Sequence, residues 1–238
     1  KMNAHGADMV EELIRIVADL KQDDGIRAVI VTGAGPAFCA GADLAYPFLG
    51  LTNTAEIRRF MNRAHTVPLG FQAMEKPVVA AINGPAIGAG LSLALGCDIR
   101  IASEKARFGS AFTAVGVHPD NGATYFLPRL VGLGRAMELM LTNRIIDAQE
   151  AERIGLVNMV VPPEQLEPTV KELARRLAQG APVALALTKN SLNQSLGQDL
   201  DTMLETESKA QSICYLTEDC KEGVEAFLGK RRPVFKGR

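Results

Sequence analysis

Two short β-branched runs, each followed by a loop of small residues, constrain the fold of this chain most. Residues 26–32 read IRAVIVT and lead into Gly33-Ala34-Gly35-Pro36, and residues 77–82 lead into Asn83-Gly84. This is the pattern of a buried strand that ends at a loop. Amphipathic helical stretches precede the two strands at residues 8–20 and 54–74. Strands that alternate with helices predict a layered α/β core.

The rest of the chain changes from mixed to helical character. Further strands are expected at 98–102 and 107–109, and a strand or extended connector at 156–161. From Gly122 onward the apolar spacing predicts helices at 123–130, 136–141, 148–154, 166–179, 183–196, 200–215 and 221–228. We therefore predict an α/β core at residues 1–141 and a helical C-terminal region at residues 142–238.

Composition argues against several classes of partner. The 238 residues carry 26 basic and 27 acidic side chains, so the basic surface of a nucleic-acid binder is missing. No apolar run reaches the ~18 residues that a membrane span needs. Four cysteines without C-x-x-C spacing suit reduced thiols, and the first residues read like mid-chain sequence without signal character. We expect a cytoplasmic protein that acts on a small molecule, with no nucleic-acid or membrane partner.

Two loops place backbone N–H groups where an anion can bind. In residues 38–43 (FCAGAD), small side chains let the main chain approach a ligand closely. Residues 83–90 (NGPAIGAG) end at a helix start, whose first N–H groups have no intrahelical partner. Together the loops predict two hydrogen bonds to one oxygen, which stabilises an enolate or a tetrahedral oxyanion. Each loop alone is also compatible with an ordinary tight turn, and neither carries a complete nucleotide-binding motif.

Six successive segments of the chain resemble the crotonase (enoyl-CoA hydratase/isomerase) superfamily, and together they cover nearly its whole length. The resemblance implies a spiral core of ββα turns with a helical trimerisation region, assembled as a homotrimer or hexamer. In pattern it is closest to the enoyl-CoA isomerases of the phenylacetate pathway. The segments are IRAVIVTGAGPAFCAGADL, KPVVAAINGPAIGAGLSLALGCDIRIAS, ARFG, GVHPDNGATYFLPRLVG, RAMELMLTNRIIDAQEAERIGLVNMVV and EDCKEGVEAFLGKRRPVFKG.

The resemblance also implies an acyl-CoA substrate. Its thioester oxygen would accept hydrogen bonds from the backbone N–H groups of Ala42 and Ala89. Most relatives have glycine in place of Ala89, but alanine still supplies the N–H. Coenzyme A enters as part of the substrate, and no other cofactor and no metal is expected. Further residues that the resemblance places near the substrate are Ala40, Asp43, Leu44, Gly88, Gly90, Ser92, Phe112, and, toward the CoA of a neighbouring subunit, Phe227 and Lys230.

The carboxylates of the chain depart from the hydratase pattern. Ser92 and Phe112 occupy the positions of the two glutamates with which hydratases activate water. Asp120, in the string GVHPDNG, stands where related isomerases and dehalogenases have an aspartate. The resemblance therefore implies that Asp120 carries protons.

A second interpretation of Asp120 is that its side chain only caps the helix that follows. A helix N-terminus would lower the pKa of this carboxyl, so a proton carrier there needs apolar surroundings, for which Phe112 and Phe126 are candidates. His118 is interpreted as a turn residue and Cys39 as a packing residue. His5 and His65 lack metal-ligand spacing.

We predict an enoyl-CoA double-bond isomerase that uses an oxyanion hole and Asp120. The alternatives are a hydratase, a hydrolase or a decarboxylase that works from the same hole, and a binding protein that keeps the fold without the chemistry.

Overall fold

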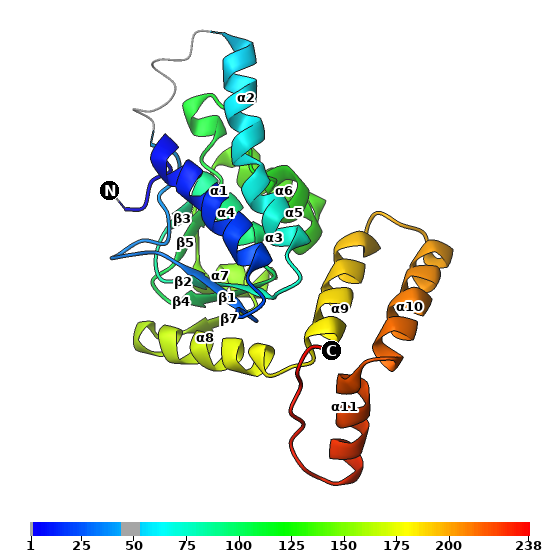
Figure 1. Ribbon diagram of the computed structural model, residues 1–238. Coiled ribbons are helices and arrows are strands. Elements are labelled where there is room, and N and C mark those ends of the chain that lie inside the picture. The colour runs from blue at the N-terminus through cyan, green and yellow to red at the C-terminus, as the bar shows by residue number, and fades with distance from the viewer. Residues whose placement is uncertain (1, 44–52) are drawn as a thin grey trace.

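The computed structural model describes residues 2–43 and 53–238 and shows a mixed α/β core with a helical C-terminal part (Figure 1). Within these residues, four parallel strands form the main sheet in the order β1-β2-β4-β7. A smaller sheet has the order β3-β5-β6, with β5 and β6 antiparallel. The strands are β1 (Val29–Thr32), β2 (Val78–Ile82), β3 (Ala86–Ile87), β4 (Ile99–Ser103), β5 (Arg107–Gly109), β6 (Ile146–Asp147) and β7 (Met159–Val161).

Helices cover both faces of the main sheet. One face carries most of the helices of the core, and α8 (Pro163–Ala178) covers the other (Figure 1). The remaining core elements are α1 (Ala7–Gln22), α2 (Thr54–Ala64), α3 (Thr66–Ala73), α4 (Ala89–Gly96), the 3-10 helix η1 (Thr113–Val115), α5 (Ala123–Val131), α6 (Leu133–Thr142) and α7 (Ala148–Arg153). Among the described residues, no helix has both the length and the apolar character needed to cross a membrane.

Strand β2 shows why the sheet needs a cover on both faces. All five of its residues are buried. Val78, Ala80 and Ile82 belong to the larger hydrophobic core, which includes residues of α4, whereas Val79 and Ala81 pack with Leu166 and Val170 of α8. Side chains alternate between the two faces of a strand, so a continuous apolar run fits a strand between two layers. This packing fixes α4, and the loop before it, against the sheet.

The predicted helix over residues 54–74 is two helices, α2 and α3, which meet at His65. Pro68 explains the break. It has no N–H to donate to the carbonyl of Ala64, and its ring crowds that same carbonyl. His65 keeps helical backbone angles and lies at the corner where the two helices meet.

Part of the predicted C-terminal region completes the core. Strand β7 pairs with β4, and α8 packs on the main sheet. Of the stretch 156–161, only the last three residues form the strand. Helices α8 and α11 begin earlier than predicted, because a proline occupies the first turn of α8 and the Thr217 hydroxyl caps α11 by accepting from the Cys220 N–H at 3.0 Å.

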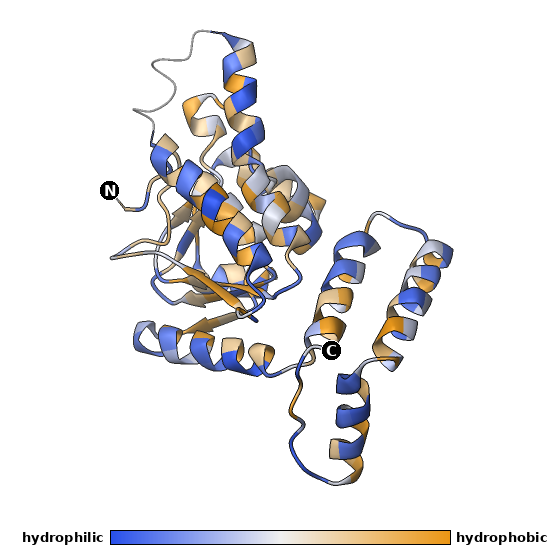
Figure 2. Cartoon of the chain, in the orientation of Figure 1, coloured by the Kyte–Doolittle hydropathy of each residue, from blue (hydrophilic) through white to orange (hydrophobic). Residues whose placement is uncertain are grey.

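Helices α9 (Pro182–Ser195), α10 (Leu200–Tyr215) and α11 (Glu218–Leu228) stand to one side of the core (Figure 1). Figure 2 shows apolar segments along all three helices. In the single chain their exposed large apolar side chains are Leu192, Leu196, Leu200, Leu204, Ile213, Tyr215, Leu216, Val224, Phe227 and Leu228. Such a surface is typical of a subunit interface. The trimer or hexamer stays a prediction.

Candidate active site

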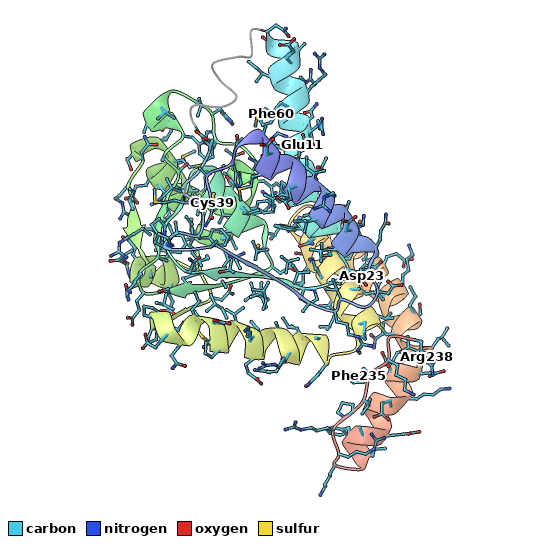
Figure 3. The ribbon with its side chains drawn as sticks, turned by 60° about the vertical axis from the view of Figure 1, so that its left-hand side comes forward. Glu11, Asp23, Cys39, Phe60, Phe235 and Arg238 are labelled. Atoms are coloured by element: carbon cyan, nitrogen blue, oxygen red, sulfur yellow. The ribbon has the colours of Figure 1, made fainter. Side chains whose placement is uncertain are left out.

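The two loops predicted to bind an anion lie against each other. The Cys39 N–H donates to the Pro85 carbonyl at 3.0 Å, and the Ile87 N–H donates to the Cys39 carbonyl at 3.0 Å. A Cβ atom on Gly90 would lie 2.2 Å from that Cys39 carbonyl oxygen, so only glycine allows this contact. Cys39 is fully buried in the interior (Figure 3), and burial raises the pKa of its thiol. These features agree with a packing role for Cys39.

Each candidate donor amide follows a glycine with a left-handed backbone. Gly41 has φ +105° and precedes Ala42, and Gly88 has φ +54° and precedes Ala89. Gly88 is also the N-cap of α4, so the Ala89 N–H is the first of the helix and has no intrahelical acceptor. Among the described residues, neither the Ala42 N–H nor the Ala89 N–H donates to a protein acceptor. Both amides are available to a ligand oxygen, and their role as an oxyanion hole stays a prediction.

These amides border a cavity of about 730 Å³, within the size range of small-molecule sites. Six of the predicted site residues line it. They are Ala40, Ala42, Gly88, Ala89, Phe112 and Asp120. Apolar side chains from α2 and from the segment around η1 complete much of the wall, among them Ile57, Met61, Val115 and Val117. The cavity therefore combines two free amides, an apolar wall and a carboxylate.

Other predicted residues lie elsewhere. Gly90 and Ser92 are on the packed side of α4, where the buried Ser92 hydroxyl donates to the Gly88 carbonyl at 3.3 Å. Asp43 is exposed and is not among the lining residues. Leu44 lies outside the described residues. The structure thus places Gly90, Ser92 and Asp43 outside the lining of the cavity.

Phe227 and Lys230 do not line this cavity either. Phe227 is 83% exposed near the end of α11, and Lys230 follows that helix. Their predicted contact is with the CoA of a neighbouring subunit, so it stays a prediction.

Asp120 does not cap helix α5 with its side chain. The N-cap residue is Gly122, and no side chain caps this end of the helix. The Asp120 carboxylate instead accepts a hydrogen bond from the Asn121 side-chain amide at 2.9 Å, while the Asp120 backbone carbonyl accepts from the Ala123 N–H at 3.0 Å. The cap-only interpretation is therefore wrong, and the carboxylate belongs to the cavity wall.

Burial raises the pKa of Asp120 above its ordinary value. The Asn121 hydrogen bond and the charges of His65 and His118 act in the opposite direction and are outweighed. The expectation of a lowered pKa is thus wrong, because desolvation dominates over the helix end. Phe112 contributes to the apolar wall as expected, but Phe126 does not, since its ring packs beneath Gly122. A raised carboxyl pKa makes the carboxylate a stronger base toward a substrate proton.

Two histidines near Asp120 escaped the sequence analysis as site residues. His65 and His118 both line the cavity. The His118 Nδ1 atom lies 2.6 Å from the Pro119 carbonyl oxygen, in keeping with a turn residue. His65 is far from Asp120 in the sequence, and Pro68 was the one signal for the helix corner that brings it close. No cluster of three or more metal-binding side chains occurs within residues 2–43 and 53–238.

Comparisons with known proteins identify the family of this chain. The family model for enoyl-CoA hydratase/isomerase matches residues 1–238. The short-chain-enoyl-CoA hydratase of Clostridium acetobutylicum is 43% identical, over 100% of this chain and 91% of that protein. The 1,2-epoxyphenylacetyl-CoA isomerase of Escherichia coli is 39% identical, over 100% of this chain and 92% of that protein.

A solved structure supports the same assignment. The crystal structure of an enoyl-CoA hydratase from Bacillus anthracis superimposes with a TM-score of 0.94 at 40% identity, covering 99% of this chain and 91% of that one. The sequence resemblance and the predicted fold class are thereby confirmed. This chain belongs to the enoyl-CoA hydratase/isomerase family of the crotonase superfamily.

Proposed function

We propose that this protein moves the double bond of an enoyl-CoA between the β,γ and α,β positions, with Asp120 as the proton carrier. One observation carries the proposal. Among the described residues that line the cavity, Asp120 is the only carboxylate, and it shares the cavity with the free amides of Ala42 and Ala89.

The chemistry follows from these three groups. Two N–H donors on the thioester oxygen stabilise negative charge there, so a proton on the α-carbon becomes more acidic. The Asp120 carboxylate takes this proton, and the electron pair spreads to the thioester oxygen. A proton then returns to the γ-carbon, and the double bond moves into conjugation with the thioester. The reaction as described needs no metal, nucleotide or flavin, and coenzyme A enters as part of the substrate.

The wall of the cavity favours an apolar acyl group. Ile57, Met61 and Val115 offer no hydrogen-bonding groups to a substrate. The raised pKa of Asp120 has the same origin, since desolvation penalises its charged form. Apolar walls therefore serve both the acyl chain and the proton carrier.

Hydration is the second candidate, and the names of relatives favour it. The relatives from Clostridium acetobutylicum and Syntrophomonas wolfei, which are named short-chain-enoyl-CoA hydratase and crotonyl-CoA hydratase, are 43% and 42% identical to this chain. Adding water across a double bond requires a group that holds and activates the water. The two positions that correspond by resemblance to the hydratase glutamates offer no such group, since Phe112 has no polar side-chain atom and Ser92 is turned away into the packing of α4.

An assay of purified protein decides between the two reactions. The parent and Asp120→Asn are compared with a β,γ-enoyl-CoA for isomerisation and with crotonyl-CoA for hydration. We expect isomerisation in the parent and a loss of about 10²–10⁴-fold in Asp120→Asn, the usual contribution of general acid–base catalysis. Asn keeps the shape of the side chain and still accepts from Asn121.

Asp19→Asn is the matched control, because it removes a carboxylate that is 70% exposed on α1. It should leave both rates within about twofold, as expected for a surface change. Efficient hydration that survives in Asp120→Asn would show that the proposed residue and the proposed reaction are both wrong.

A further inference from the structure

His65 has a backbone fixed by hydrogen bonds and a side chain that makes no hydrogen bond to a described residue. Its backbone is anchored at the corner between α2 and α3, where the His65 N–H donates to the Met61 carbonyl at 2.9 Å and its carbonyl accepts from Leu69 at 3.3 Å. The imidazole ring is half-buried and lines the same cavity as Asp120. No hydrogen bond or ion pair joins this ring to any described residue. Within the described part of the chain, both ring nitrogens are therefore free to bind a ligand.

The other histidine of the cavity differs in both respects. His118 is exposed, and its Nδ1 atom is engaged by the Pro119 carbonyl. Of the two histidine charges that act on Asp120, the charge of His65 has the larger effect. His65, His118 and Asp120 are the ionisable groups among the described lining residues. Of the two histidines, His65 is therefore the better placed to exchange a proton with a substrate that also contacts Asp120.

We propose that His65 is a second catalytic residue, which returns a proton to the substrate after Asp120 has removed one. The inference rests on the proposed isomerase function and assigns its second half. A double-bond shift removes a proton from one carbon and adds a proton to another carbon two atoms away. His65 at the corner before α3 and Asp120 in the loop before α5 line the same cavity, so each carbon can have its own proton-transfer group.

The step balances as follows. The Asp120 carboxylate bonds to the α-hydrogen as that C–H bond breaks, and the electron pair delocalises to the thioester oxygen at the Ala42 and Ala89 amides. The enolate electron pair then forms a C–H bond at the γ-carbon, and the hydrogen comes from the imidazolium of His65 as its N–H bond breaks. Asp120 ends protonated and His65 neutral. A proton passing from Asp120 to His65 through solvent restores both.

Isotope incorporation tests this directly. Turnover in D₂O of an unlabelled β,γ-enoyl-CoA should place solvent deuterium at the γ-carbon in the parent, because an imidazolium exchanges its protons with solvent. His65→Gln should lower kcat by about 10²-fold or more with little change in KM. Its residual product should retain protium at the γ-carbon, since Asp120 alone must then carry the same proton to the second carbon.

His118→Gln is the matched comparison, with the same substitution in the same cavity, and it should cost at least tenfold less in kcat than His65→Gln. If His65→Gln fails to fold, His65→Ala is assayed with added imidazole, and turnover that imidazole does not raise overturns the proposal. Parent-like kcat and parent-like labelling in His65→Gln also overturn it. Loss of activity in Asp120→Asn without loss in His65→Gln removes the role of His65 alone, whereas an active Asp120→Asn removes the proposed function itself.

Discussion

Helix α4 buries its apolar surface within the chain, whereas helix α10 leaves its apolar surface exposed. In α4 (Ala89–Gly96) nearly every residue is buried within the single chain, whereas α10 (Leu200–Tyr215) has no buried residue. Helix α4 contains no charged side chain and lies between the sheet and its neighbouring helices, but α10 mixes exposed leucines with acidic and basic residues. A helix closed on all sides is held rigidly, and one with an open apolar face is complete only against a partner.

This difference matters for the site. The Ala89 amide lies at the first residue of α4, so its position is as fixed as the packing of that helix. Pre-organised donors stabilise developing charge because they need not reorient during the reaction. The chain thus places a well-packed helix at the predicted oxyanion site, whereas α9, α10 and α11 expose the apolar side chains from which we predict subunit contacts.

Gly90→Ala should be the most damaging single change. The added methyl group would meet the Cys39 backbone carbonyl at 2.2 Å, and a backbone atom between two packed loops cannot shift as a flexible side chain can. We expect a loss of about 3 kcal/mol or more in unfolding free energy, measured by urea denaturation.

Gly134→Ala in α6 is the control, since nothing lies within 4 Å of the added methyl group. It should raise stability by about 0.5–1 kcal/mol, because alanine favours a helix over glycine. Equal stability of Gly90→Ala and the parent would contradict the close packing of α4.

His5 should make the N-terminal side of the site sensitive to acid. Burial lowers the pKa of His5 to about 4, and its Nε2 atom has no hydrogen-bond partner among the described residues. Because the unfolded chain binds the proton more tightly, stability is present above pH ~6.5 and is lost as the pH falls toward 4. The full effect is ~3 kcal/mol. The described side chains around this ring in its small cavity include no other ionisable group.

The measurement compares unfolding free energies of the parent and His5→Phe at pH 7 and pH 4.5. The variant should lose less stability on acidification than the parent. The backbone of His5 pairs with the first loop, because the His5 N–H donates to the Gly41 carbonyl at 2.8 Å. As the pH falls, the parent should therefore lose activity at a higher pH than His5→Phe. An identical pH dependence in the two proteins would show that His5 is not held neutral by the fold.

Features that depend on local pattern could be predicted from the sequence, and features that depend on distant contacts could not. The run at residues 77–82 is buried on both faces, so its composition alone indicated strand β2. Gly90 packs against the Cys39 carbonyl of another loop, a contact that no local pattern indicates. Its position in the sequence had predicted a substrate contact instead. The cap interpretation of Asp120 was settled only by the backbone, because the left-handed Gly122 takes the N-cap position. His65 lines the cavity because α2 and α3 meet at this residue, and the helical periodicity of residues 54–74 does not mark that junction.

Asp120→Asn should separate activity from stability. The folded-state pKa of Asp120 is raised by burial, so the folded chain binds this proton more tightly than the unfolded chain. Its contribution to stability is therefore present at low pH and is lost as the pH rises through the folded pKa. At pH 7 the buried charge gives no stability, and the neutral amide should leave the unfolding free energy unchanged or raise it by up to about 1 kcal/mol. A clear loss of stability at pH 7 would mean that the carboxylate has a structural role.

Leu204→Glu combined with Leu216→Glu should have the smallest effect on the chain itself and should sharpen the contrast with α4. Leu204 is 52% exposed and Leu216 is 87% exposed in the single chain, so charged replacements disturb little internal packing. In dilute, dissociated protein we expect a change within about 0.5 kcal/mol in unfolding free energy.

If the open face forms the predicted trimer or hexamer, the same charges must be buried between subunits, which is costly without a partner charge. Sedimentation should therefore show an assembled parent and a monomeric variant at micromolar concentration, with circular dichroism confirming equal helix content. A parent that sediments as a monomer would break the comparison, because α10 would then be an exposed apolar helix without any partner, and the predicted reach of Phe227 and Lys230 to a neighbouring CoA would lose its basis.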